Sequence, residues 1–150
     1  MEDQMKTMAP MMMLLMRGIG ELSKAFYQKY GREALPVVTE VASRGGVEWG
    51  KIVQQTTPDR SMKAVAEMLK GMSSMAGMDT EIIELSDNKF HFKQSKCPLC
   101  VEKTSKELCE ALMNNDLKMI STFLGKEVDM NILKSLAAGD DKCEVVYSTK

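Results

Sequence analysis

The first half of the chain places apolar residues at the three- and four-residue steps of amphipathic helices. One stripe predicts a helix over about residues 10–29 and consists of Met12, Leu15, Ile19, Leu22 and Phe26. Gly31 ends this helix, and the apolar positions that follow predict a second helix over about residues 32–55. A third stripe begins at Met62, directly after the candidate N-caps Asp59 and Ser61, and ends near Gly77.

In the second half, the period of the pattern changes from helical to strand-like. The runs "TEIIELS" and "KFHFKQ" are separated by Asp87 and Asn88, which predicts a hairpin. A second hairpin is predicted where "EVDMNILKSL" and "KCEVVYST" flank the turn "AAGDD". Between the hairpins, "VEKTSKELCEALMNN" and "DLKMISTFLG" predict two helices. The pattern indicates an α+β fold, with N-terminal helices packed on a mostly antiparallel four-stranded sheet in a single domain over residues 1–150.

Composition and charge exclude several classes of protein. The 150 residues include 20 Lys and Arg against 21 Asp and Glu, and no long run of one sign accompanies the net charge of −1. The sequence therefore offers no basic surface for nucleic acid. No apolar run reaches the roughly 20 residues of a membrane span. Because the sequence also shows no secretory signal pattern, we expect a cytoplasmic protein without a membrane span.

In a reducing compartment, cysteines are more often metal ligands or redox groups than disulfides. Cys97 and Cys100 form a C-x2-C knuckle, Cys109 lies in the helix that follows, and Cys143 enters the last predicted strand. If that helix packs on the terminal hairpin, the four sulfurs could form a closed zinc site, with an iron–sulfur cluster as the alternative. Another interpretation remains open, in which Cys109 and Cys143 are buried apolar residues. Cys97 and Cys100 would then form an isolated redox pair or a merely structural one.

His91 is the single histidine of the chain. It alternates with Phe90 and Phe92 on a predicted strand, so its side chain faces the opposite side of the sheet from the two aromatic rings. The position is compatible with a ligand-binding residue, a proton donor or a solvent-facing strand residue.

Three glycines in the second predicted helix need a physical reason, because each costs about 1 kcal/mol relative to alanine. Gly45, Gly46 and Gly50 would allow a close helix contact, leave room for a ligand, or mark a kink. Trp49 beside them supplies a large amphipathic wall.

These residues, together with Met72, Phe90 and Phe92, form the predicted pocket between the helices and the sheet. The chain contains 15 methionines, whose flexible side chains suit an adaptable pocket for an apolar molecule, a partner surface or a methionine-rich core. The heptad-like spacing from Met12 to Phe26 also permits two subunits to pair, so we expect a homodimer.

Several of these motifs together resemble the 4-vinyl reductase domain family, proposed hydrocarbon-binding modules related to the TRAPP and haem-nitric-oxide-binding superfamily. The resemblance covers about residues 33–149 and depends on "VASRGGVEWGKIV", "CPLC", Cys109 and "AAGDDKCEVVY". A neighbouring family, the L-2-amino-thiazoline-4-carboxylate hydrolase-like proteins, shares the "YGREAL" segment and the same cysteine-bearing last strand. The chain departs from the vinyl reductase pattern before the Gly139-Asp140 turn, where the family often has a further cysteine. Cys100 is the candidate substitute.

The resemblance implies a ligand-binding or sensory module, which holds an apolar small molecule between helices and sheet and is braced by a cysteine-bound ion. The alternative is an enzyme, either a thiazoline-carboxylate hydrolase or a cysteine-based redox protein, in which His91 would pair with Cys97. A third hypothesis is a protein-assembly adaptor that uses the methionine-rich helices as its interface.

Overall fold

The structure is a computed structural model, which describes residues 2–150, without the side chains of residues 2, 3 and 5. Four helices and four strands follow one another in the order α1 (Glu2–Tyr30), α2 (Ala34–Thr56), α3 (Met62–Met75), β1 (Thr80–Ser86), β2 (Lys89–Gln94), α4 (Lys106–Leu124), β3 (Val128–Lys134) and β4 (Cys143–Thr149). Short 3-10 turns, η1 (Gly31–Glu33) and η2 (Leu136–Ala138), precede α2 and β4.

The sheet is antiparallel throughout and has the order β1-β2-β4-β3. Both predicted hairpins are present, and their inner strands pair with each other, so that Phe90 lies opposite Tyr147 and Phe92 opposite Val145. The predicted α+β fold class is therefore confirmed. Ser61 caps α3 by accepting a hydrogen bond from the Ala64 amide at 3.2 Å.

The segment between the hairpins differs from the prediction. It forms one continuous helix, α4, where the sequence pattern indicates two. Ser105 caps its start, and Gly125, with a positive φ of 64°, ends it. Asn114 and Asn115 do not interrupt the helix because their side-chain amides donate to the carbonyls of Glu110 and Ala42, at 2.9 and 3.2 Å. Polar residues that favour turns in isolation are therefore accommodated inside a helix by hydrogen bonds.

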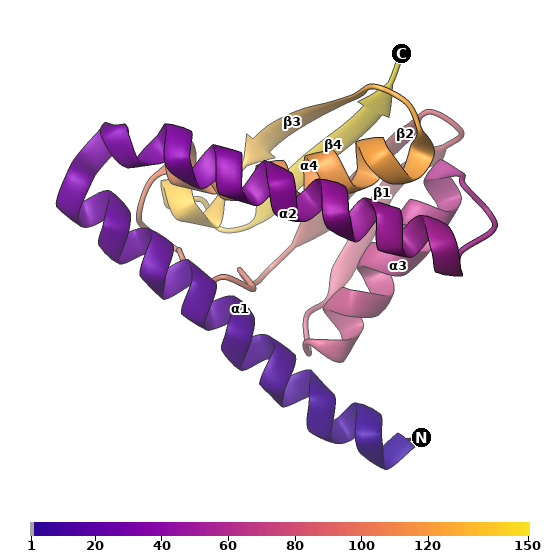
Figure 1. Ribbon diagram of the computed structural model, residues 1–150, viewed down its shortest axis with the longest axis horizontal. Helices are drawn as coiled ribbons and strands as arrows, with labels where there is room; N and C mark the ends of the chain where they lie inside the picture. The colour runs from indigo at the N-terminus through magenta and orange to yellow at the C-terminus, as the bar shows by residue number, and fades with distance from the viewer. Residues whose placement is uncertain (1) are drawn as a thin grey trace.

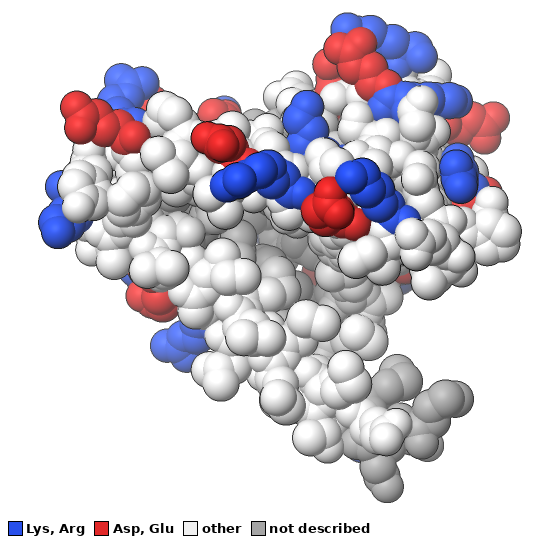
Figure 2. Space-filling model, in the orientation of Figure 1, with Lys and Arg blue, Asp and Glu red and all other residues white. Residues whose placement is uncertain are grey.

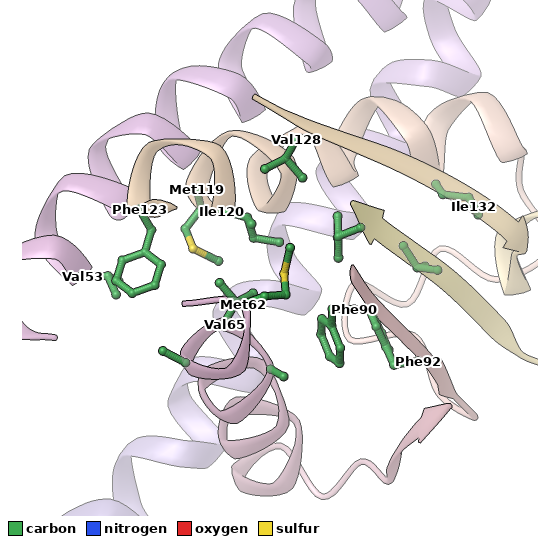
Figure 3. Packing of buried hydrophobic residues seen from close by; sticks show 14 residues of the cluster. Val53, Met62, Val65, Phe90, Phe92, Met119, Ile120, Phe123, Val128 and Ile132 are labelled. Carbon is green, nitrogen blue, oxygen red and sulfur yellow. The ribbon is translucent and has the colours of Figure 1, made fainter. Parts of the chain in front are cut away.

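The main hydrophobic core lies between one face of the sheet and the helices α3 and α4 (Figure 1). Phe90 and Phe92 from β2 face Met62 and Val65 from α3, while Met119, Ile120 and Phe123 extend from α4 (Figure 3). α2 lies over the outer side of α4. α4 is consequently covered on one side by the sheet and on the other by α2.

α2 and α4 approach each other closely at two glycines. A Cβ added to Gly46 would lie closer than 3.0 Å to the Asn115 carbonyl oxygen, and one added to Gly50 would lie 2.7 Å from the Met119 carbonyl oxygen. Both obstacles are main-chain atoms, so rotation of a side chain cannot relieve them. Of the three roles left open for these glycines, the structure uses Gly46 and Gly50 for close helix contact in an unbroken helix.

We predict that Gly46→Ala lowers the free energy of unfolding by about 1–3 kcal/mol, because α2 must move away from the α4 backbone. Gly71→Ala is the matched control, since Gly71 lies inside α3 and an added Cβ would meet nothing within 4 Å. This change should raise stability by about 0.5–1 kcal/mol through helix propensity. Urea unfolding of both variants measures the difference, and equal effects would contradict the close contact.

Candidate functional site

A buried hydroxyl without a partner marks the candidate site. Tyr147 on β4 has an exposed fraction of 0%, and its Oη has no hydrogen-bond partner among the described residues. Burial raises the pKa of this phenol well above its usual range, and Asp116 and Cys109 raise it further. Since both of these residues belong to α4, the hydroxyl reaches toward that helix. An unpaired buried hydroxyl costs about 1–3 kcal/mol, so its retention needs a reason.

Asp116 is the acidic group of this site. It lies seven residues, or about two turns, after Cys109 on α4, so the two side chains share a helix face. Desolvation raises the pKa of Asp116 from 3.8 to about 6, and no cation among the described side chains opposes the shift. Because the folded-state pKa lies above the ordinary value, ionisation of Asp116 disfavours folding as pH rises through this interval.

Two thiols and a serine complete the polar groups around α4 and β4. Burial raises the pKa of Cys109, while the Ser135 side chain opposes the shift by a hydrogen bond. Burial likewise raises the pKa of Cys143 to about 11, although the Leu136 amide donates to its sulfur at 3.5 Å. We call Cys109, Asp116, Ser135, Cys143 and Tyr147 the α4–β4 polar cluster. It combines hydrogen-bonding groups with apolar walls, because Phe92 packs beside Tyr147 with ring centroids 6.2 Å apart.

The loop that carries the C-x2-C knuckle covers one end of α4. Val101 is buried in a second hydrophobic cluster with Leu108 and Ala137, and Cys97 and Leu99 pack against it. The Lys103 amide donates to the Leu136 carbonyl at 2.9 Å, which ties the loop to the turn before β4. Cys100 has a positive φ of 54°. The loop thus covers the cysteine-bearing end of the helix.

Three of the four cysteines lie near one another in this region. Cys97 and Cys109 act on the pKa of Cys143, and Cys97 acts on that of Cys109. Within residues 2–150, however, no group of three or more His, Cys, Asp or Glu side chains is arranged so that it could hold a metal ion. The side-chain positions do not form a ready ligand set. The prediction of zinc or an iron–sulfur cluster at Cys97, Cys100, Cys109 and Cys143 therefore stays a prediction.

The residues of the predicted pocket are distributed between the core and the helix contact. Phe90 and Phe92 are buried on the sheet face that also carries Tyr147, with exposed fractions of 0% and 6%. Trp49 is half-buried against the main core, and Met72 is half-buried on α3. Gly45 lies beside the α2–α4 contact, since an added Cβ would be 3.1 Å from the Asn115 side-chain nitrogen. Phe92 stacks beside Tyr147 and Phe90 lies opposite it in the sheet, so both phenylalanines adjoin the α4–β4 polar cluster.

His91 lies on the opposite face of the sheet. Its Nε2 is 2.8 Å from Glu144 Oε1, and Lys93 Nζ is 3.9 Å from the other carboxylate oxygen. Strand alternation places the sheet between His91 and the α4–β4 polar cluster. The structure therefore pairs His91 with Glu144 and gives no support for a pairing with Cys97.

Sequence reasoning missed Asp116, Ser135 and Tyr147. The sequence signal was present for Asp116, since it is a charged residue two turns after a cysteine on an otherwise apolar helix face. The predicted start of a separate helix at Asp116 hid this signal, because the two residues then belong to different elements. Tyr147 carried no such signal, because an aromatic residue on a strand is ordinary core composition.

Two surface pockets lie elsewhere. One, of about 200 Å³, is lined by residues that include Arg60, Ser61 and Lys126. The other, of about 410 Å³, lies over α2 and α4 and includes Arg44 and Lys118. Neither contains a residue of the α4–β4 polar cluster. In the described part of the chain, no helix is long and apolar enough to cross a membrane.

Helices that cover one face of a four-stranded antiparallel sheet in this order define a TRAPP-like α+β domain. The chain belongs to the L-2-amino-thiazoline-4-carboxylic acid hydrolase family, whose sequence profile matches residues 8–147. The match confirms the resemblance and selects the second of the two families to which the sequence is similar.

Two solved structures share the fold. The phenol-responsive sensory domain of the transcription activator PoxR, with phenol, is 15% identical with a TM-score of 0.65, over 89% of this chain and 74% of that chain. A trafficking protein particle complex subunit 3 from Naegleria fowleri, covalently bound to palmitic acid, is 17% identical with a TM-score of 0.58, over 93% and 95% of the two chains. No curated protein sequence matches significantly.

We predict that Cys143 is alkylated about 100-fold more slowly in the native protein than in denaturant, because its raised pKa reduces the thiolate fraction at neutral pH. Iodoacetamide labelling with mass-spectrometric site assignment measures the rate, and the denatured protein is the control. A native Cys143 that reacts as fast as the denatured one would contradict its burial.

Elemental analysis of the same sample tests the zinc prediction. One zinc per chain with four protected thiols would support the metal site.

Proposed function

We propose that the protein binds a small, mostly apolar ring compound at the α4–β4 polar cluster. The observation that carries the proposal is the buried Tyr147 hydroxyl, which has no partner among the described residues and lies near the desolvated Asp116. Ligand pockets combine apolar walls with a few convergent polar groups. Tyr147 offers a donor, Asp116 an acceptor, and Phe92 an aromatic wall.

The chemistry of these groups favours a ligand with a nitrogen-rich edge. An ionised Asp116 without an opposing cation would pair with a protonated or N–H-bearing group, which would also offset the desolvation of the carboxylate. The 2-amino-thiazoline ring in the family's name carries such an edge. The fold is compatible with a small-molecule site, since the similar PoxR domain holds phenol and the Naegleria subunit holds palmitic acid.

Access of a ligand to the cluster requires a movement of the cover. The knuckle loop packs on the end of α4 through Val101 and Leu99, away from the tight α2–α4 contact at Gly46 and Gly50. We infer that the loop, rather than α2, moves when a ligand binds. This movement would supply the signal of a sensory domain, because it changes the surface that a partner contacts.

We predict that Tyr147→Phe makes the protein more stable but weakens ligand binding. Removal of the unpaired hydroxyl should raise the free energy of unfolding by about 1 kcal/mol. The same change should weaken binding of L-2-amino-thiazoline-4-carboxylic acid about ten-fold, through loss of one hydrogen bond. Thermal unfolding and isothermal titration calorimetry measure the two effects.

The matched control is Tyr30→Phe, because Tyr30 is 48% exposed and lies at the end of α1. Phenol serves as a second probe that offers a hydroxyl without the nitrogen edge. Binding of either compound with equal affinity to the wild type and to Tyr147→Phe would refute the assignment of the site. Binding of phenol alone would retain the site and reject the nitrogen-rich ligand.

A second candidate function is hydrolysis of the bound thiazoline ring. Two observations favour it: the membership of the hydrolase family and the raised pKa of Asp116, about 6, which suits a general base near neutral pH. In this proposal Asp116 accepts a proton from a water molecule as the water oxygen bonds to the ring carbon that bears the amino group. One ring bond of that carbon then breaks, and Asp116 returns the proton to the ring heteroatom that leaves. Tyr147 donates a hydrogen bond to the substrate during these steps.

We predict that ring opening of L-2-amino-thiazoline-4-carboxylic acid accelerates as pH rises through about 6, since Asp116 must lose its proton to act as a base. Asp116→Asn should reduce the rate at least about 100-fold. Asp129→Asn, at an exposed position of β3, is the control and should leave the rate unchanged. Proton NMR of the substrate follows the reaction. Binding without any ring opening would reject the hydrolase and leave the binding proposal intact.

A further inference from the structure

α1 carries a row of large apolar side chains that the described part of the chain leaves exposed. The exposed fractions are 62% for Met8, 47% for Met12, 65% for Leu15, 55% for Ile19 and 74% for Leu22. Scattered apolar side chains are ordinary on a protein surface, but a contiguous strip of this kind marks an interaction site. We call these five residues the α1 strip.

The spacing of the α1 strip is that of a helix pair. Its members follow one another at steps of four, three, four and three residues, which is the alternation of a and d positions in a heptad repeat. Phe26, half-buried beside Tyr30, continues the same alternation. The strip from Met8 to Leu22 is about 21 Å long at 1.5 Å per residue. It therefore suits an occupant that is itself a helix.

A different face of α1 binds the body of the protein. An added Cβ at Gly20 would lie closer than 3.0 Å to the Leu99 carbonyl oxygen, so this side of the helix is pressed against the knuckle loop. Gly20 is one residue, or about 100°, away from Ile19 in the α1 strip. Toward its N-terminal end, α1 diverges from α2 (Figure 1). The body thus anchors α1 by one face and leaves the strip accessible.

The lack of charged residues beside the α1 strip favours a second copy of the same helix as its partner. With Met12 and Ile19 at a positions, the e and g positions beside the strip are uncharged and consist of Ala9, Met11, Met16, Gly18, Ser23 and Ala25. Helix pairs that select a different partner use charges at these positions, whereas identical helices must avoid like charges there. Figure 2 shows charged side chains gathered over α2, while the face of α1 in this view is largely uncharged. An identical strip meets these requirements.

We propose that the α1 strip pairs with the same strip of a second copy of this chain. The protein is then a homodimer joined along α1. The proposal is independent of the proposed ligand site, since Met8, Met12, Leu15, Ile19 and Leu22 belong to neither hydrophobic cluster and to no part of the α4–β4 polar cluster.

The test is the oligomeric state of Leu15→Glu, measured by sedimentation equilibrium and light scattering on the full chain at micromolar concentrations. The wild type should be a dimer, and a charge at the centre of the strip should raise the dissociation constant at least about 30-fold. Leu14→Glu is the matched control, because Leu14 is the adjacent residue, is similarly exposed at 70%, and lies outside the a and d positions. It should remain a dimer.

Circular dichroism establishes that the variants are folded, and Leu22→Glu repeats the test at a second position if Leu15→Glu does not fold. A monomeric wild type would overturn the proposal. This holds even where the monomer binds phospholipid vesicles through α1, because the strip would then have a different partner. Equal dissociation constants for the Leu14 and Leu15 variants would overturn it as well. Dissociation by Leu15→Glu or Leu22→Glu, but not by Leu14→Glu, would support it.

Discussion

The close contact between α2 and α4 determines how α4 is oriented against the sheet. Gly46 and Gly50 let the two helices approach until an added Cβ would meet the α4 main chain. Gln54 strengthens the contact, because its side-chain nitrogen donates to the Thr122 carbonyl at 2.6 Å. α4 is held between α2 and the sheet, and its orientation fixes which of its side chains face β4. Close backbone packing of this kind leaves little freedom for rotation of the helix.

The orientation of α4 places polar side chains in the core, where they reduce stability. The face of α4 that meets β4 carries Cys109 and Asp116 among apolar residues, opposite the unpaired hydroxyl of Tyr147. A fold selected for stability alone would fill these positions with apolar side chains, because desolvated polar groups without partners reduce stability. Buried groups with shifted pKa values are common at functional sites for the same reason. The cluster is therefore the part of the core that stability does not explain.

The knuckle loop lies between the end of α4 and α1, so it contacts elements of both the proposed ligand site and the proposed subunit interface. The loop covers the cysteine-bearing end of α4 on one side, and Gly20 of α1 is pressed against its Leu99 carbonyl on the other. A movement of the loop that admits a ligand would consequently change the support of α1. In a dimer joined along α1, occupancy of one site would then act on the subunit interface, since a ligand can shift an equilibrium only through contacts that differ between two states.

Most helices and strands could be predicted from the sequence, because hydrophobic periodicity, caps and turn residues act within a few positions of the chain. Its pattern predicted both hairpins and the helices near residues 10–29, 32–55 and 62–77, although α1 already begins at Glu2. Its motifs resembled two families, and the chain belongs to the second. It left the three roles of Gly46 and Gly50 unresolved, and it divided α4 in two at Asp116, since an asparagine pair looks like a break until Ala42 supplies a hydrogen-bond acceptor. Only the tertiary structure brought Asp116, Cys109 and Tyr147 together and placed His91 on the far side of the sheet. Such proximity depends on the packing angle of α4 against β4, which no local pattern specifies, because it follows from contacts between residues distant in the sequence.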